Sequence, residues 1–353
     1  LDNGQHILLG AYRETLKLLQ KIGVNEKDAF LRLPLNLEMR TGSQTVFKLA
    51  PPACFPAPFN QLIGFLFFQG LKWHERLSTI QFMLRLKKSN YQLVTDEPLA
   101  DFLQKNKQSN NVVMLLWEPL CLAALNTPIH LASSKVFLNV LRDTFNKKTD
   151  SDFLLPKLDL SQLFSVPIAQ YLKAHQATIL HNKRVKNITQ NANGYTISTK
   201  EETFGASHMI IAMSPVRLSN VIGDLPKLNH IAEQTDSYAY QPITTIYLQY
   251  QLNATLSAPI LGLAGGLSQW VFDRGALCGQ NGLMAVIISA EGKHQDMTQE
   301  DLALKIAQEL KVAFPQLDKP LWHKVIAEKR ATFSCNVNLP RPAHVTPYPH
   351  LYL

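Results

Sequence analysis

The chain has 353 residues, 46% of them hydrophobic and 18% charged, which excludes intrinsic disorder and predicts two or more domains. Its four cysteines are far apart and include no Cys-x-x-Cys pair, so neither a disulfide framework nor a zinc site is predicted and a reducing cytoplasm is favoured. The net charge of +8 comes from short, scattered basic clusters without interleaved aromatic residues, which argues against a nucleic-acid partner and favours an anionic membrane surface.

The first 150 residues are predicted to be mostly helical after a short hairpin. A helix over 11–22 ends at Gly23, and the alternating runs 35–39 and 45–49 flank a turn, which predicts a hairpin. Proline residues then separate a series of apolar segments. Helices are predicted over 59–69, 72–88, 98–106, 109–116, 118–125 and 133–145.

From residue 153 onward the pattern alternates between helix and strand. A helix is predicted over 167–176, strands over 178–180 and 185–188, and a hairpin at Asn193-Gly194. The run 208–213 has the composition of a fully buried strand. Farther along the chain, the predicted elements are strands over 243–250, 269–273, 283–289 and 322–328, and a helix capped by Thr298 over 299–313.

Glycine spacing carries the strongest negative evidence. No two of the 16 glycines are separated by a single residue, so the chain has no Gly-x-Gly-x-x-Gly motif, the fingerprint that binds the phosphates of a dinucleotide. Walker A, His-Glu-x-x-His and Gly-x-Ser-x-Gly motifs are absent as well. The motif search therefore disfavours hydrolases and metalloenzymes and predicts no metal site.

Six segments carry a family resemblance when they are taken together and in order. They are Asp2–Tyr12, Trp117–Thr127, Pro242–Leu248, Trp270–Gly275, Val286–Ala290 and Glu328–Phe333. In this combination the chain resembles the squalene-associated FAD-dependent desaturases, the hydroxysqualene dehydroxylases of hopanoid biosynthesis. That family belongs to the flavin amine oxidase and phytoene desaturase superfamily. Each segment alone is a weak signal, whereas six in order make a specific match.

The resemblance implies an α/β (mixed α+β) fold, in which an incomplete Rossmann-like FAD-binding domain joins a substrate domain of helices and a mixed β-sheet. The glycine loop that holds the dinucleotide is expected to lie before Leu1, so we expect a chain truncated at both ends, from which FAD could be absent. The implied domain parts are the FAD-binding domain at 1–25, 151–220 and 336–353, a helical substrate or membrane-facing region at 26–150, and a sheet-plus-helix substrate domain at 221–335.

The resemblance also places the first residues beside the isoalloxazine ring, so that Asn3, Gly4, Gln5 and His6 would bind FAD. Gly4 lets the backbone approach the ring, and His6 is a candidate catalytic residue because it can donate a hydrogen bond to flavin or substrate. The structural alternative is a turn at Gly4 and an ordinary polar residue at His6. Val185 matches a strand whose backbone holds the adenine end of FAD, although any sheet strand has the same pattern.

Glu118 is the second candidate catalytic residue. It lies between Trp117 and Pro119, a sequence that predicts the end of one helix and the start of another, where the helix dipole stabilises a carboxylate. The alternative is a buried acid that lines a substrate tunnel. Four further residues are candidates to line the same tunnel, and the alternative is that they belong to the hydrophobic core. They are Trp117, Tyr240, Pro242 and Trp270.

The region after residue 59 has the composition of a membrane-facing helix. Apolar bulk is followed by a tryptophan and by basic side chains, and the candidate membrane contacts are Phe65, Phe67, Phe68 and Trp73. The apolar run 62–68 is far shorter than the roughly 20 residues that a membrane-spanning helix needs. We therefore expect a cytoplasmic protein, peripheral at the inner face of the membrane, with a buried helix as the alternative.

The family reaction would be the reductive dehydroxylation of hydroxysqualene, a C30 isoprenoid, to squalene with reduced FAD. Two alternatives stay open: a carotenoid-type FAD desaturase acting on a phytoene-like or dehydrosqualene-like polyene, and an inactive fragment that only binds an apolar ligand. The expected partners are the apolar isoprenoid substrate, the membrane surface and other enzymes of squalene and hopanoid biosynthesis. The oligomeric state and the electron donor are left open.

Overall fold

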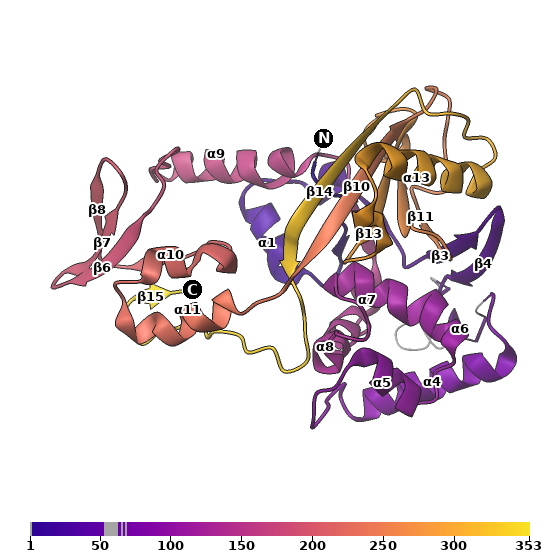
Figure 1. The fold of residues 1–353 in the computed structure, drawn as a ribbon, viewed down its shortest axis with the longest axis horizontal. Coiled ribbons are helices and arrows are strands. Elements are labelled where there is room, and N and C mark those ends of the chain that lie inside the picture. Colours follow the sequence, from indigo (N-terminus) through magenta and orange to yellow (C-terminus); the bar gives the residue numbers. More distant parts are fainter. Residues whose placement is uncertain (1, 53–62, 65, 68) are drawn as a thin grey trace. The chain divides into compact units, whose positions relative to one another are not determined.

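The computed structural model describes residues 2–52, 63, 64, 66, 67 and 69–353 (Figure 1). The chain divides into two compact units, Leu1–Tyr171 with Tyr240–Val337, and Leu172–Ala239 with Asn338–Leu353. Both units contain helices and β-strands, which confirms the predicted mixed α/β class. The predicted domain ranges stay predictions. Within the described ranges, none of the helices has both the length and the apolar composition that crossing a membrane requires.

A seven-stranded sheet forms the centre of the first unit. Its strands are β3 (Leu37–Thr41), β4 (Gln44–Leu49), β10 (Tyr240–Gln249), β11 (Ile260–Leu263), β12 (Trp270–Asp273), β13 (Leu283–Ser289) and β14 (Trp322–Phe333). They are ordered β14-β10-β13-β12-β11-β3-β4, and every neighbouring pair is antiparallel except β3 with β11. The predicted hairpin and the four predicted strands beyond residue 240 are confirmed, whereas β11 was not predicted.

The two faces of this sheet have different neighbours. Val286 of β13 packs in one cluster with Ile306 of the helix α13 (Gln299–Ala313), which covers that face. Ala285, the preceding residue on the same strand, packs on the opposite face with Tyr247 and Phe272. Because both faces are covered, every residue of β13 is buried. The face of Tyr247 is the one that the N-terminal segment contacts.

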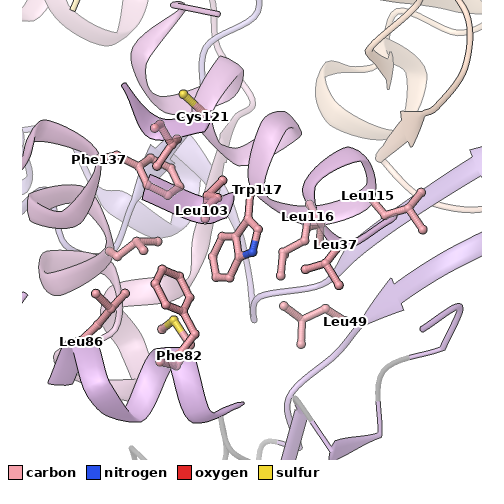
Figure 2. Packing of buried hydrophobic residues seen from close by; sticks show 14 of the residues in the cluster. Leu37, Leu49, Phe82, Leu86, Leu103, Leu115, Leu116, Trp117, Cys121 and Phe137 are labelled. Carbon is pink, nitrogen blue, oxygen red and sulfur yellow. The ribbon is translucent and has the colours of Figure 1, made fainter. Parts of the chain in front are cut away.

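A layer of helices occupies residues 73–144 of the first unit. It consists of α4 (Trp73–Lys88), α5 (Leu99–Lys105), α6 (Asn110–Val112), a π-helical turn (Val113–Trp117), α7 (Glu118–Leu125) and α8 (Ser134–Thr144). Trp117 lies in the core of this layer and meets the rings of Phe82 and Phe137 nearly edge-on (Figure 2). The helix predicted over 59–69 lies mostly outside the described residues, and the other predicted helices here are confirmed.

The predicted helix break at Trp117-Glu118-Pro119 is wrong. Trp117 and Glu118 keep right-handed helical angles, so the backbone stays helical from α6 through α7. The amide of Glu118 donates to the carbonyl of Val113, five residues back. Pro119 has no N–H to donate, and the widened π turn just before it is the local solution. Glu118 therefore lies inside a continuous helix, not at a free N-terminus that a carboxylate would cap.

A second sheet in the first unit fixes the start of the chain. It is ordered β1-β5-β2, from β1 (Leu8–Leu9), β5 (Phe153–Pro156) and β2 (Phe30–Leu33). Leu8 pairs with Leu154, which brings the N-terminal segment beside the residues that follow β5. The remaining helical elements that lie at least partly in the first unit are α1 (Arg13–Lys21), α2 (Glu26–Ala29), short turns at Lys148–Ser151, Ser161–Ser165 and Lys293–Asp296, α9 (Val166–Ala174), which ends in the second unit, and α12 (Arg274–Cys278).

The second unit combines a small antiparallel sheet with short helices. Its elements are β6 (Asn187–Asn191), β7 (Gly194–Ser198), β8 (Thr203–Ala206), β9 (Met209–Ile210), α10 (Ser219–Ile222), α11 (Asn229–Asp236), β15 (Leu351–Tyr352) and short turns at Pro215–Arg217 and Pro226–Leu228. The order β6-β7-β8 contains the predicted hairpin, with Asn191 paired to Gly194. The strand β15 pairs in parallel with β9.

Of three further strand predictions in this unit, one is wrong and two are confirmed only in part. Residues 178–180 are exposed and irregular, because a strand needs a partner for its backbone groups and the described chain offers none there. Of the predicted strand 185–188, only Asn187 and Ile188 lie in β6, so Val185 is not within a strand. Of the run 208–213 only Met209–Ile210 is a strand, and Ile210 is 75% exposed. Among the described strands β9 pairs with β15 alone, so it is not a central strand, and the exposure of Ile210 shows that one of its faces is uncovered.

Candidate functional site

The N-terminal segment is fixed to the sheet by side chains of β10. Tyr247 donates from its hydroxyl to the carbonyl of Asp2 at 2.8 Å, and Thr245 donates to the carbonyl of Asn3 at 3.1 Å. The two donors are two residues apart on one strand, so they point to the same face of the sheet. This anchoring fixes the backbone that leads into Gly4 and His6.

A second set of hydrogen bonds connects this segment to α12. Gln5 donates from its amide nitrogen to the Tyr247 hydroxyl at 2.8 Å, and its amide oxygen accepts from Nη1 of Arg274 at 2.8 Å. Burial raises the pKa of Tyr247, and the Arg274 charge lowers it by a smaller amount. We call Gln5, Tyr247 and Arg274 the Gln5 junction. It connects three of the six family segments.

A pocket lies next to the Gln5 junction. Its polar lining comes from Asp2, Gln5, His6 and Arg274, and Gly4 contributes backbone. Its apolar lining is Leu155, Pro156, Leu158, Leu160, Phe272 and Leu277. The pocket thus combines a buried cation, a carboxylate and an imidazole with apolar walls, and its enclosed space is about the size of one water molecule.

His6 lies at the rim of this pocket. The residue is exposed overall, yet burial of its ring lowers the pKa of the imidazole, and the Asp2 carboxylate raises it by a smaller amount. A lowered pKa keeps the ring neutral at neutral pH, so one nitrogen can donate and the other can accept a hydrogen bond. The structure therefore brings Gly4, Gln5 and His6 to one pocket. It fixes Asn3 through the backbone carbonyl of that residue.

Four of the six family segments meet at Asn126, the left-handed C-cap of α7. Its amide nitrogen donates to the carbonyl of Pro242 at 3.2 Å and to the Thr332 hydroxyl at 3.0 Å. Its amide oxygen accepts from the backbone of Ala290 at 2.7 Å. We call these residues the Asn126 junction. It is buried and neutral, which is the arrangement of a structural connection.

Glu118 does not line the pocket that His6 lines. It is half-buried in α7, where burial raises the pKa of its carboxyl group and His130 lowers it by a smaller amount. The structure therefore does not bring the two candidate catalytic residues together in this pocket. The role of Glu118 in a reaction stays a prediction.

The predicted tunnel residues occupy different environments. Trp117 is 1% exposed, and its indole nitrogen donates to Gln108 at 3.0 Å, so its polar atom is satisfied inside the helical core (Figure 2). Pro242 is buried in β10, whereas Tyr240 and Trp270 are half-buried at the starts of β10 and β12. Contact of these four residues with a substrate stays a prediction.

Two further sets of predicted site residues lie elsewhere. Val185 is half-buried and packs against the core of the second unit. Of the predicted membrane residues, Phe67 is 74% and Trp73 is 61% exposed. Phe65 and Phe68 lie outside the described residues.

Sequence reasoning missed Arg274 and Asn126 as functional or structural centres. Both lie in segments that carried the family resemblance, which was the available signal. The importance of Arg274 depends on burial and on partners 269 residues away in the chain, which no local pattern reveals.

Comparison with known proteins shows the family of the chain. The family described as flavin containing amine oxidoreductase matches the chain over residues 1–353. A hydroxysqualene dehydroxylase of Zymomonas mobilis subsp. mobilis is 27% identical over 250 residues, which cover 67% of this chain and 55% of that protein. The chain therefore spans about half the length of this curated relative.

Solved structures share the fold. An oxidoreductase from Methanosarcina mazei superposes with a TM-score of 0.68 at 11% identity, covering 98% of this chain and 81% of that chain. A cyclohexylamine oxidase from Brevibacterium oxydans superposes with a TM-score of 0.65 at 14% identity, covering 96% of this chain and 77% of that chain. Identities this low establish the fold alone.

Proposed function

The chain belongs to the family of flavin-containing amine oxidoreductases, and on this basis we propose that the protein is an FAD-dependent enzyme that converts hydroxysqualene to squalene. The observation that carries the proposal is the similarity to a hydroxysqualene dehydroxylase over 250 residues. The Gln5 junction supports it, because family segments far apart in sequence meet beside one pocket.

The residues around the pocket offer groups that the edge of a flavin ring can contact, while the enclosed space itself holds about one water molecule. The backbone at Gly4 is buried and carries no side chain toward the pocket, and Arg274 supplies a positive charge. When bound and reduced, FAD supplies the hydride that replaces the hydroxyl group of the substrate. The pocket's apolar side chains, among them Leu155, Phe272 and Leu277, keep water away from the reacting carbon.

His6 and Glu118 are the proposed proton-handling residues. A neutral His6 at the pocket rim can donate a hydrogen bond to the hydroxyl that leaves as water. Glu118 has a raised pKa, so a larger fraction of its carboxyl group carries a proton near neutral pH than for an exposed glutamate. Both assignments follow from these protonation states and from the family resemblance.

The test is conversion of substrate by the full-length protein. We expect the purified protein, given FAD, a reductant and hydroxysqualene, to release squalene, identified by mass spectrometry. If the protein binds FAD but releases no squalene, the proposed dehydroxylase activity is contradicted. Hydride removal from phytoene or dehydrosqualene would instead establish a desaturase, and a protein that never holds FAD would be a binder of apolar ligands.

We further propose that the protein works at the surface of a membrane. A C30 hydrocarbon is nearly insoluble in water, so the enzyme has to collect it from a lipid phase. Trp73, Leu77 and Leu84 are 61%, 39% and 47% exposed, and their spacing places them on one side of α4. Lys87 and Lys88 in the last turn add positive charge beside this apolar stripe, which complements anionic lipids.

Flotation with liposomes that contain an anionic lipid tests this surface. The double variant Trp73→Ser with Leu84→Ser should weaken binding by about thirtyfold, since each exposed side chain loses roughly 1 kcal/mol of apolar burial in lipid. The matched control changes Leu304 and Val312, two exposed apolar residues of α13, to Ser. Equal flotation of both double variants would remove the membrane role from α4.

A further inference from the structure

The two edges of the seven-stranded sheet differ in their pairing. At one edge, the backbone of Lys48 in β4 donates to and accepts from the backbone of Gln69 at 3.2 Å, so this strand has a partner on its outer side. At the other edge, β14 pairs with β10, and among the described residues no second strand or bridge pairs with it (Figure 1). Every second residue of an edge strand directs its N–H and C=O away from its one partner. The edge of β14 can therefore accept another strand.

The regular part of this edge is the range Trp322–Glu328. Over these residues β14 stays in unbroken register with β10, and a bulge follows Glu328. A bulge bends a strand and interrupts the ladder, so an added strand would pair with the residues before it. The exposure of the side chains agrees, because Trp322 is 44% exposed and Lys324, Ala327 and Glu328 are exposed as well.

Two opposite charges lie on one face of this edge. Lys324 and Glu328 are four residues apart in the strand, so their side chains point to the same face, with Ile326 between them. Neither makes an ion pair with another described residue. If two copies of this strand pair antiparallel about Ile326, Lys324 of each copy lies opposite Glu328 of the other. The edge is therefore complementary to itself, and the same attraction occurs twice.

We propose that β14 is a dimerisation edge, at which a second copy of this chain adds its own β14 antiparallel and extends the sheet across both copies. The contact is isologous, because each copy contributes the same strand. Backbone hydrogen bonds supply the pairing, and the two Lys324–Glu328 pairs select the register and favour a second copy over an unrelated strand. No cofactor or substrate takes part, so the proposal is independent of the proposed function.

The experiment measures the oligomeric state of the purified full-length protein by sedimentation velocity over a range of concentrations. We expect an equilibrium between monomer and dimer. Lys324→Glu and Glu328→Lys should each weaken dimerisation by about tenfold, because two like-charged pairs replace two attractive ones. The double variant exchanges the two charges and should restore the wild-type affinity. Lys305→Glu is the matched control, since it reverses the charge of an exposed lysine on α13, and it should leave the dimer unchanged.

Restoration by the double variant is the decisive result. A wild-type protein that stays monomeric at every concentration would overturn the proposal. A dimer that both single variants leave unchanged would do the same, since it would form through another surface. Weakening by the single variants without restoration by the double variant would show that the two charges do not face each other, which also overturns the proposed pairing. Melting curves like that of the wild type confirm that folded proteins are compared.

Discussion

The Asn126 junction and the Gln5 junction differ in charge and in access to solvent, although both connect family segments in the same unit. At Asn126 the partners are neutral and lie inside the protein, and the amide is 5% exposed. At Gln5 the hydrogen bonds end on a cation that also lines a pocket. Neutral, satisfied groups stabilise a fold, whereas a buried charge facing a pocket stabilises the fold poorly and suits a ligand. Family segments therefore divide into structural and chemical ones.

The largest expected effect separates the two junctions by stability. Asn126→Ala removes the hydrogen bonds to Ala290, Pro242 and Thr332, while the amide of Ala290 still donates to the carbonyl of Pro242 at 3.0 Å. At about 1 kcal/mol for each lost bond, the variant should lower the free energy of unfolding by about 3 kcal/mol, measured by urea denaturation. Part of that loss arises because alanine adopts the left-handed backbone at Asn126, where φ is 45°, less readily than asparagine does. The same variant should leave the reduction potential of FAD unchanged.

Asn90→Ala is the matched control for the backbone part. Asn90 is exposed and also left-handed, with φ of 51°. Its replacement should cost about 1 kcal/mol, because only the conformational preference is lost. Equal losses in the two variants would show that the hydrogen bonds of Asn126 add nothing, and the division between the junctions would disappear.

A smaller effect is expected at the Gln5 junction. Tyr247→Phe removes the hydroxyl that donates to Asp2 and accepts from Gln5, and it should cost about 1 kcal/mol in unfolding free energy while weakening FAD binding. Tyr250→Phe is the control on the same stretch of chain. Its hydroxyl is buried, and within the described residues no hydrogen bond reaches it, so its removal should be neutral or stabilising. Equal losses would mean that the junction contributes packing alone.

The sequence predicted what depends on local periodicity. The helix 299–313 and the strand 283–289 have the predicted bounds, because amphipathic spacing, a Thr cap and an unbroken apolar run are local signals. The strand at 178–180 failed because a strand is defined by a partner elsewhere in the chain. The helix break at Trp117 failed because a π turn can absorb Pro119 without ending the helix.

The candidate site was predicted in part for the same reason. The family resemblance pointed to Gly4, Gln5 and His6, which do line one pocket. Arg274 was missed because its role follows from burial and from neutral partners across the chain. A sequence of one protein shows that an arginine is present, and only the packed structure shows that it is buried and hydrogen-bonded to Gln5 and Gln280.

The smallest expected effect compares two histidines by pH. His294 follows Ala290 of the Asn126 junction in the chain, is 4% exposed and has a pKa lowered by burial, which Asp296 offsets in part. A folded-state pKa below the ordinary value of 6.5 means that the unfolded chain binds the proton more tightly. This contribution to stability is therefore present above pH 6.5 and is lost as the pH falls through the folded pKa. We expect His294→Gln to flatten the decline in unfolding free energy between about pH 7.5 and pH 5.

His6→Gln is the counterpart at the pocket. Burial lowers the pKa of His6 too, but the residue is exposed overall, so water screens its charge and the flattening should be smaller than for His294→Gln. Urea denaturation at matched pH values measures both variants, and the acidic residues common to them cancel in the comparison. A larger change from His6 than from His294 would reverse the contrast, because it would place the better buried titrating group at the pocket instead of beside the Asn126 junction.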